Sequence, residues 1–169
     1  MKTNRLSYNR LSYKEMILLA LIGLTLAFIW GHSLIPATGS AKESMRLMVM
    51  INEFLSKINA PVQLQGDKVL RKIAHATEYL VLGGEIGMFG FWRYTRRFAS
   101  AVRKCRKARI QVLFNCLHLG VWISVIDETL QLFVPGRYGQ ISDVWIDCAG
   151  FAVGAVIVYF LASRKRRVR

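Results

Sequence analysis

The chain has 169 residues, of which 53% are hydrophobic, and its mean hydropathy of +0.30 is high for a soluble domain. It also carries 24 Lys and Arg against 10 Asp and Glu, a formal net charge of +14. This length suggests one domain. The composition argues against an evenly mixed soluble fold, because the basic residues lie in blocks and the apolar residues in long runs, as in integral membrane proteins.

Four segments are long and apolar enough to be considered as membrane spans. A hydrocarbon core about 30 Å thick requires roughly 20 mostly apolar residues in a helix. Residues 16–36, 69–92, 110–134 and 144–163 meet this requirement, and none shows the period-two alternation of barrel strands. We therefore predict an all-α polytopic membrane protein with four transmembrane helices, forming one domain over residues 1–169.

The segment between the first two spans has a different character. Apolar residues recur there at helical spacing, while charged residues fall largely elsewhere on the helical wheel. The segment is too short and too polar to span a membrane. We expect residues 42–58 to form an amphipathic helix that lies on the outer membrane surface or caps the bundle.

The basic residues predict the orientation of the spans. The connection at residues 93–109 contains eight basic residues and no acid, and the tail at residues 163–169 contains five. The positive-inside rule then places this loop and both termini in the cytoplasm. No aromatic-interleaved binding motif accompanies the basic blocks, so contact with anionic lipid is favoured over nucleic acid. An alternative treats the first span as a cleavable signal peptide, with residues 37–41 as the cleavage site.

Three of the spans carry polar stripes. At 100° per residue, Arg71, His75 and Glu78 share one face of the second span, and Lys72 and Tyr79 border it. The same geometry groups polar residues on the third and fourth spans, namely Ser124, Asp127, Glu128 and Gln131 on the third and Asp143 and Asp147 on the fourth. On the fourth span, two glycines continue the line of the carboxylates and allow close approach of a neighbouring helix.

These stripes are expected to face one another, because a charge facing lipid costs at least about 2.5–3.5 kcal/mol at the midplane. The loop between the last two spans contains Pro135-Gly136 and Gly139, which predict a tight turn that aims Arg137 over the cluster. We predict an outward-facing polar cavity lined by Asp67, Arg71, Lys72, His75, Glu78, Tyr79, Asp127, Glu128, Gln131, Arg137, Asp143 and Asp147. Carboxylates can bind a divalent cation, but the three cations nearby argue against a dedicated site, so no metal and no cofactor is assigned.

The sequences RKIAHATEYLVLG, DETLQLFVPGRYGQISDVWIDCAG and GHSLIP resemble the VanZ-like family of bacterial membrane proteins. Multi-residue motifs in the same order carry this resemblance. It implies a protein of the bacterial cell membrane, associated with resistance to the glycopeptide teicoplanin and acting at the cell envelope, without implying a reaction. One position departs from the family pattern, since Leu130 occupies a place where the family usually has histidine.

The expected function is to bind or modify the anionic headgroup of a membrane lipid or a lipid-linked envelope component. Arg71, Lys72 and Arg137 would hold the anion. If chemistry occurs, Asp127, Glu128 and His75 would supply acid and base. Asp143 and Asp147 would orient Arg137, while Glu78, Tyr79 and Gln131 would complete the ligand site. The alternative is a non-enzymatic envelope protein that sequesters the glycopeptide or its target, or that scaffolds an envelope protein partner.

Overall fold

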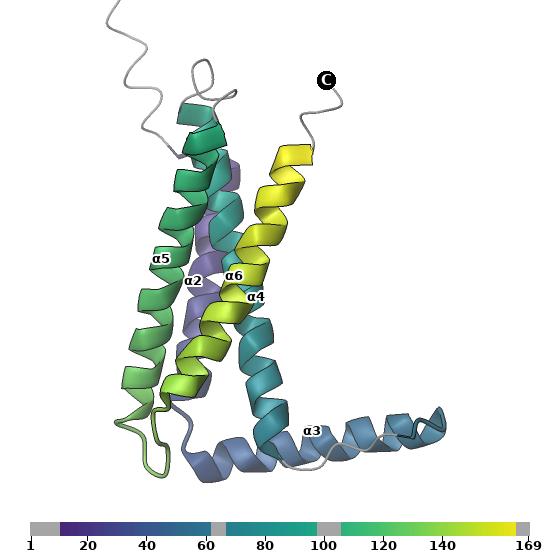
Figure 1. Cartoon of the computed structure of the whole chain (residues 1–169). Coiled ribbons are helices and arrows are strands. Elements are labelled where there is room, and N and C mark those ends of the chain that lie inside the picture. Colours follow the sequence, from purple (N-terminus) through teal and green to yellow (C-terminus); the bar gives the residue numbers. More distant parts are fainter. Residues whose placement is uncertain (1–10, 62–66, 98–105, 165–169) are drawn as a thin grey trace, which may run out of the picture.

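The computed structural model describes residues 11–61, 67–97 and 106–164. Within them the chain forms only α-helices, named as in Figure 1: α2 (Tyr13–Ser33), α3 (Ala37–Lys57), α4 (Asp67–Arg97), α5 (Arg106–Gln131) and α6 (Ile141–Arg164). The all-α prediction is confirmed for these residues. Part of the expected basic loop, residues 98–105, and most of the basic tail, residues 165–169, lie outside the described residues.

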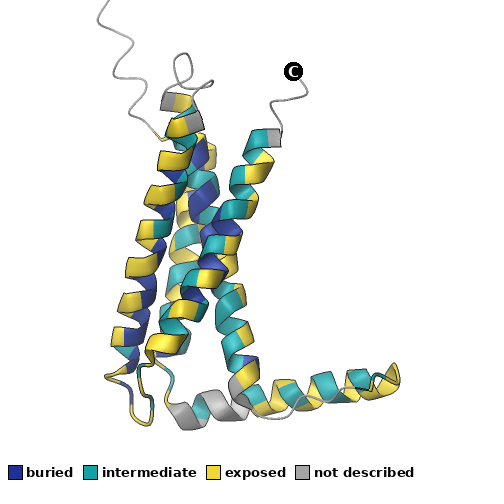
Figure 2. Cartoon of the chain, in the orientation of Figure 1, coloured by how far each residue is buried: buried dark blue, intermediate teal, exposed yellow. Residues whose placement is uncertain are grey.

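Three helices are long and apolar enough to cross a membrane: α2, α5 from Lys107 and α6 up to Ser163. Only 17% to 33% of the residues in the apolar part of each helix are buried inside the protein. Figure 2 shows exposed residues along the outer faces of these helices. Large exposed hydrophobic side chains on these faces include Leu24, Phe28, Phe114, Phe160 and Leu161. Such surfaces are typical of helices that face lipid, so the chain is a membrane protein.

The prediction of four spans is not confirmed, because α4 is not among these three helices. Its 31 residues include the polar stripe identified in the sequence, which lowers its apolar content. The other boundaries shift slightly. The first helix ends at Ser33, three residues before the expected end at Pro36. Pro36 is instead the N-cap of α3, which begins five residues earlier than expected. The third ends at Gln131 and is followed by turns up to Val134.

The closest helix packing joins α4 to α6. A Cβ added to Gly150 would overlap the carbonyl oxygen of Ala76, and one added to Gly154 would overlap that of Leu80. The contact is reciprocal, because a Cβ on Gly83 would overlap the carbonyl oxygen of Phe151. Small residues spaced four apart allow the two backbones to touch. The close approach predicted from the two glycines of the fourth span is thus confirmed, and the neighbour is α4.

The amphipathic segment forms α3, which lies across one end of the bundle, roughly perpendicular to the other helices (Figure 1). Large apolar residues along it remain exposed, including Met45, Met50 and Phe54. The connection from α2 to α3 and the loop from α5 to α6 lie at this same end, whereas α2 begins and α6 ends at the opposite end. The polar residues of the stripes lie near the start of α4, the end of α5 and the start of α6, so we expect them to meet at the α3 end of the bundle.

At the opposite end, Glu15 joins α2 to α4. Its side chain completes a capping box with Ser12 at the start of α2. The same carboxylate accepts a hydrogen bond of 2.8 Å from Arg96 and lies 3.7 Å from Arg93. This ion pair fixes the end of the bundle that the polar stripes do not reach.

Candidate functional site

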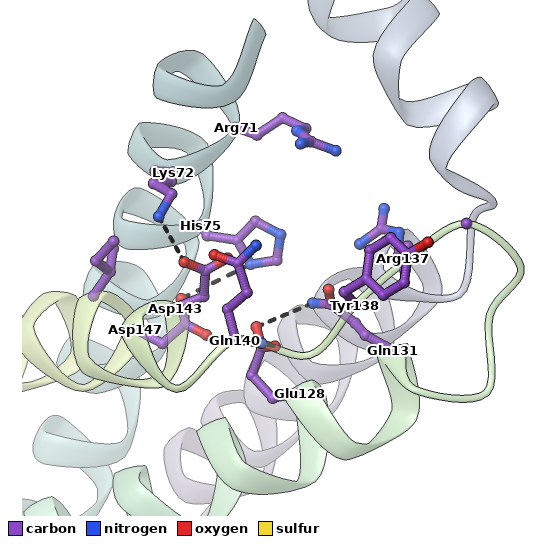
Figure 3. A pocket seen from close by; sticks show the side chains of 12 residues that line it. Arg71, Lys72, His75, Glu128, Gln131, Arg137, Tyr138, Gln140, Asp143 and Asp147 are labelled. Atoms are coloured by element: carbon purple, nitrogen blue, oxygen red, sulfur yellow. Dashed lines mark hydrogen bonds and ion pairs between the residues drawn. The ribbon is translucent and has the colours of Figure 1, made fainter.

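A cavity of about 410 Å³ lies at the α3 end of the bundle, between the start of α4, the end of α5, the start of α6 and the loop that joins α5 to α6 (Figure 3). It is lined by Arg71, Lys72, His75, Glu128, Gln131, Gly136, Arg137, Tyr138, Gln140, Asp143, Ile146 and Asp147. The structure therefore brings together most of the residues that the sequence assigns to a site. The side chain of Asp67 lies outside the described residues.

The loop positions Arg137 through a tight turn. The Arg137 N–H donates to the Val134 carbonyl at 3.1 Å, with Pro135 and Gly136 between them. Gly136 has a φ of 77°. This combination defines a type II turn, in which proline suits the second position and glycine the third. The turn places Arg137 at the cavity, as the sequence predicts.

Arg137 is held by different partners from those expected. Its Nε donates to the Ile35 carbonyl at 2.8 Å and one terminal nitrogen to the His32 carbonyl at 3.2 Å. These are carbonyls at the C-terminal end of α2, where a cation is favourable. The prediction that Asp143 and Asp147 orient Arg137 is thus wrong, because Asp143 pairs with Lys72 and Asp147 faces His75.

The rim of the cavity is cationic. Lys72 Nζ donates to Asp143 Oδ1 at 2.8 Å, and both side chains are partly exposed, at 40% and 31%. Arg71 extends from α4 into the same space from the side opposite Arg137 (Figure 3). Burial, followed by the nearby Arg71 guanidinium, lowers the pKa of Arg137 below its ordinary value. Two guanidinium groups that repel one another across a cavity favour an anion between them.

The floor of the cavity combines one histidine with two buried carboxylates. Nδ1 of His75 lies 3.8 Å from an oxygen of Asp147 and 3.9 Å from an oxygen of Asp127. Asp127 is 0% exposed and Asp147 is 1% exposed. Of these three residues, His75 and Asp147 line the cavity, and Asp127 lies beneath them without lining it.

A hydrogen-bonded group connects α5 to its neighbours. The Glu128 carboxylate accepts a hydrogen bond of 3.0 Å from the backbone N–H of Gln140. It accepts a second, of 3.4 Å, from the side-chain amide of Gln131. Gln131 also reaches the Ser33 hydroxyl, at 3.5 Å. The bond from Gln140 satisfies a backbone donor next to the start of α6. Glu128 therefore both binds the loop between α5 and α6 and lines the cavity.

Two predicted ligand residues lie beside the cavity and do not line it. Tyr79 is 0% exposed and belongs to the packed core. Glu78 faces His32, with 3.6 Å between its carboxylate and the Nδ1 atom. The His32 ring in turn lies nearly parallel to that of His75, with 6.5 Å between centroids. The end of α2 thus lies beside the site through His32 and Ser33, and neither of these residues lines the cavity.

The sequence did not identify Tyr138, Gln140 and Ile146 as lining residues. Tyr138 and Gln140 flank Gly139 in the same loop as Arg137, so their position in the quoted motif was an available signal. Ile146 lies three residues after Asp143 on α6, and helical spacing could have placed it on the same face. The role of the Ile35 carbonyl could not have been read from side-chain chemistry.

A family model described as VanZ/LLP1 matches residues 16–162. The chain belongs to this family. The match includes every described residue of the cavity, and it confirms the resemblance carried by the motifs on α4, α5 and α6. No curated protein sequence and no solved structure matches the chain. Leu130, where the VanZ-like pattern usually has histidine, is half-buried and does not line the cavity.

Proposed function

We propose that this VanZ-like protein spans the bacterial cell membrane four times, with both termini in the cytoplasm, and binds an anionic phosphate-bearing headgroup at the outer leaflet. The headgroup would belong to a membrane lipid or to a lipid-linked envelope component. An association with teicoplanin resistance is expected from the resemblance to the VanZ-like family.

The fourth span in this proposal is α4. A helix of 31 residues is about 46 Å long, longer than the roughly 30 Å hydrocarbon core. Its polar residues Arg71 and His75 line the cavity, and Glu85 accepts a hydrogen bond from Thr25 of α2 at 3.1 Å. Polar groups that face protein partners in this way are the tolerated kind within a membrane.

The orientation is supported by the position of described basic residues. Arg93, Arg96, Lys107 and Arg109 lie near the end of α4 and the start of α5, at the end of the bundle opposite the cavity. By the positive-inside rule this end is cytoplasmic, so the cavity faces outward. At the outer surface, α3 would rest its exposed apolar residues in the interface, beside the cavity.

The observation that carries the binding proposal is the convergence of Arg71, Lys72 and Arg137 on one cavity at the expected headgroup level. Arg137 uses two of its five N–H donors on the carbonyls of His32, in α2, and Ile35, just after it, which leaves three for a ligand. Guanidinium groups bind phosphate oxygens in pairs. If the bound component is also modified, Glu128 and His75 are the groups that reach the cavity with acid and base capacity.

The test is retention of lipid by the full-length protein. The protein would be reconstituted in nanodiscs of phosphatidylglycerol and phosphatidylcholine, and released into native mass spectrometry. We expect preferential retention of phosphatidylglycerol, reduced roughly 10-fold or more in Arg71→Ala, since a charged hydrogen bond is worth about 1.5–3 kcal/mol. Lys107→Ala removes a cation at the opposite end and serves as the matched control. Equal retention in both variants, or no preference in the wild type, would refute the proposal.

Chemistry is tested separately by isosteric changes. Asp127→Asn and Glu128→Gln keep side-chain size but remove acid and base capacity. If protection against teicoplanin survives both changes and is lost in Arg137→Ala, the site binds without using these carboxylates as catalysts. Loss of protection in Glu128→Gln with lipid retention intact would instead indicate a reaction.

A further inference from the structure

The floor of the cavity brings three metal-binding side chains together from three helices. His75 comes from α4, Asp127 from α5 and Asp147 from α6. One ligand atom from each lies within 4.8 Å of the other two. The sequence argued against a metal because three cations are close, but the structure places those cations at the rim.

The rim cations have other partners. Lys72 is paired with Asp143 at 2.8 Å, and Arg137 binds the two carbonyls at the end of α2. Neither makes an ion pair with Asp127 or Asp147 among the described residues. Neither of these two cations therefore neutralises a floor carboxylate directly, although Arg137 lies near enough to act on Asp127 electrostatically.

The two carboxylates lack the partners that burial demands. Both oxygens of Asp127 and both of Asp147 are buried, and none meets the geometry of a hydrogen bond within the described part of the chain, although the polar side chains of Ser33, Tyr79 and Gln131 lie near Asp127. Buried charges in proteins are paired or coordinate metals. His75 approaches each carboxylate only at 3.8–3.9 Å, and a single imidazolium can neutralise one of them at most.

We propose that His75, Asp127 and Asp147 bind a divalent transition-metal ion, Zn²⁺ or Mn²⁺, at the floor of the cavity. One imidazole with two carboxylates is a mixed nitrogen and oxygen set, which suits these ions better than Mg²⁺ or Ca²⁺ with their all-oxygen preference. This site does not depend on anion binding at the rim, because all its ligands come from the protein.

The geometry is close to that required. Two ligands of a tetrahedral Zn²⁺, each about 2.0–2.1 Å from the ion, lie about 3.4 Å apart. The observed separations of 3.8 and 3.9 Å from His75 exceed this by less than 1 Å. Small side-chain rotations would bring the three atoms around an ion. Because His75 and Asp147 line the cavity, the remaining coordination positions would face the space where a phosphate could enter.

A metal at the floor gives two sequence features another meaning. Asp127 would act as a ligand and not as a general base. Leu130 no longer implies a missing ligand, since the histidine in the cluster is His75 and Leu130 does not line the cavity.

The experiment is equilibrium metal binding by the full-length protein in mild detergent. The purified protein would be stripped with a chelator, dialysed against Zn²⁺ or Mn²⁺ alone, and its metal content measured by mass spectrometry. We expect one ion per chain, with the affinity reduced by at least about 100-fold in Asp147→Asn, since even changes outside the ligand shell cost 10–100-fold. Glu15→Gln is the matched control, because it removes a buried carboxylate at the opposite end of the bundle and should retain the ion.

Wild-type protein without a bound ion, or Asp147→Asn with unchanged affinity, would overturn the proposal. If Asp147→Asn fails to fold, electron paramagnetic resonance of Mn²⁺ in the wild-type protein replaces it. Coupling to one imidazole nitrogen is then expected, and the absence of nitrogen coupling would exclude His75 as a ligand.

Discussion

The close contact between α4 and α6 predicts that even a glycine-to-alanine substitution at this interface will lower the stability of the protein. In Gly154→Ala, the added Cβ would overlap the Leu80 carbonyl oxygen and lie 2.8 Å from the Gly84 nitrogen, where ordinary contact begins at 3.4 Å. Both obstacles are backbone atoms, and the Gly84 contact alone requires the helices to separate by about 0.6 Å, with a larger separation needed for the Leu80 carbonyl oxygen. Overpacking of this kind costs about 1–3 kcal/mol, and we expect that loss in the free energy of unfolding.

The matched control is Gly23→Ala on α2, where an added Cβ meets nothing within 4 Å. There the change should be neutral or stabilising by up to about 1 kcal/mol, because alanine is the better helix former. Both variants would be unfolded by SDS titration in mixed micelles, followed by tryptophan fluorescence. Equal stability of the two variants would contradict the close contact between the backbones of α4 and α6.

Three further predictions concern other contacts. Arg137→Lys should lower stability by about 1–2 kcal/mol while keeping the charge, because a single ammonium cannot reproduce both guanidinium bonds to the end of α2; thermal unfolding in detergent measures this, and no loss would show that these bonds are unimportant. A double-mutant cycle of Lys72→Met and Asp143→Asn should give a coupling of only about 0.2–1 kcal/mol, since the pair is partly exposed, and a larger coupling would place it in a drier environment. Glu15→Gln should weaken the bond to Arg96 and lower stability by about 1 kcal/mol without altering lipid retention, and loss of lipid would indicate that the two ends are coupled.

The helices and the face on which the polar residues lie were predictable from periodicity. Arg71 and His75 share a stripe on α4 because they are four residues apart, and both line the cavity. The same reasoning placed Glu78 on that stripe, but it lies about one turn further along the helix and meets His32 of α2 instead. The face of a helix on which a side chain lies follows from local sequence spacing. The level at which that side chain meets its neighbours depends on how the four helices of the bundle are aligned.

Partner choice was the part that sequence reasoning could not supply. The sequence favours Asp143 and Asp147 as partners of Arg137, because all three lie within one motif and both acids are opposite in charge to the arginine. The type II turn instead directs Arg137 to α2, about one hundred residues earlier in the chain. Backbone carbonyls have no signature in the sequence, so a cation that caps a distant helix cannot be distinguished from one that pairs with nearby acids.

The site and the packing are consequences of one arrangement. Gly150 touches Ala76, the neighbour of His75, and Asp147 precedes Gly150 by three residues on α6. Once the two backbones meet at that level, His75 and Asp147 must lie close to one another at 3.8 Å. Turning either away would expose a charge to lipid at a cost of several kcal/mol. The glycines therefore fix the spacing of the floor as well as the stability of the bundle, and Gly150→Ala should weaken metal binding even though it removes no ligand.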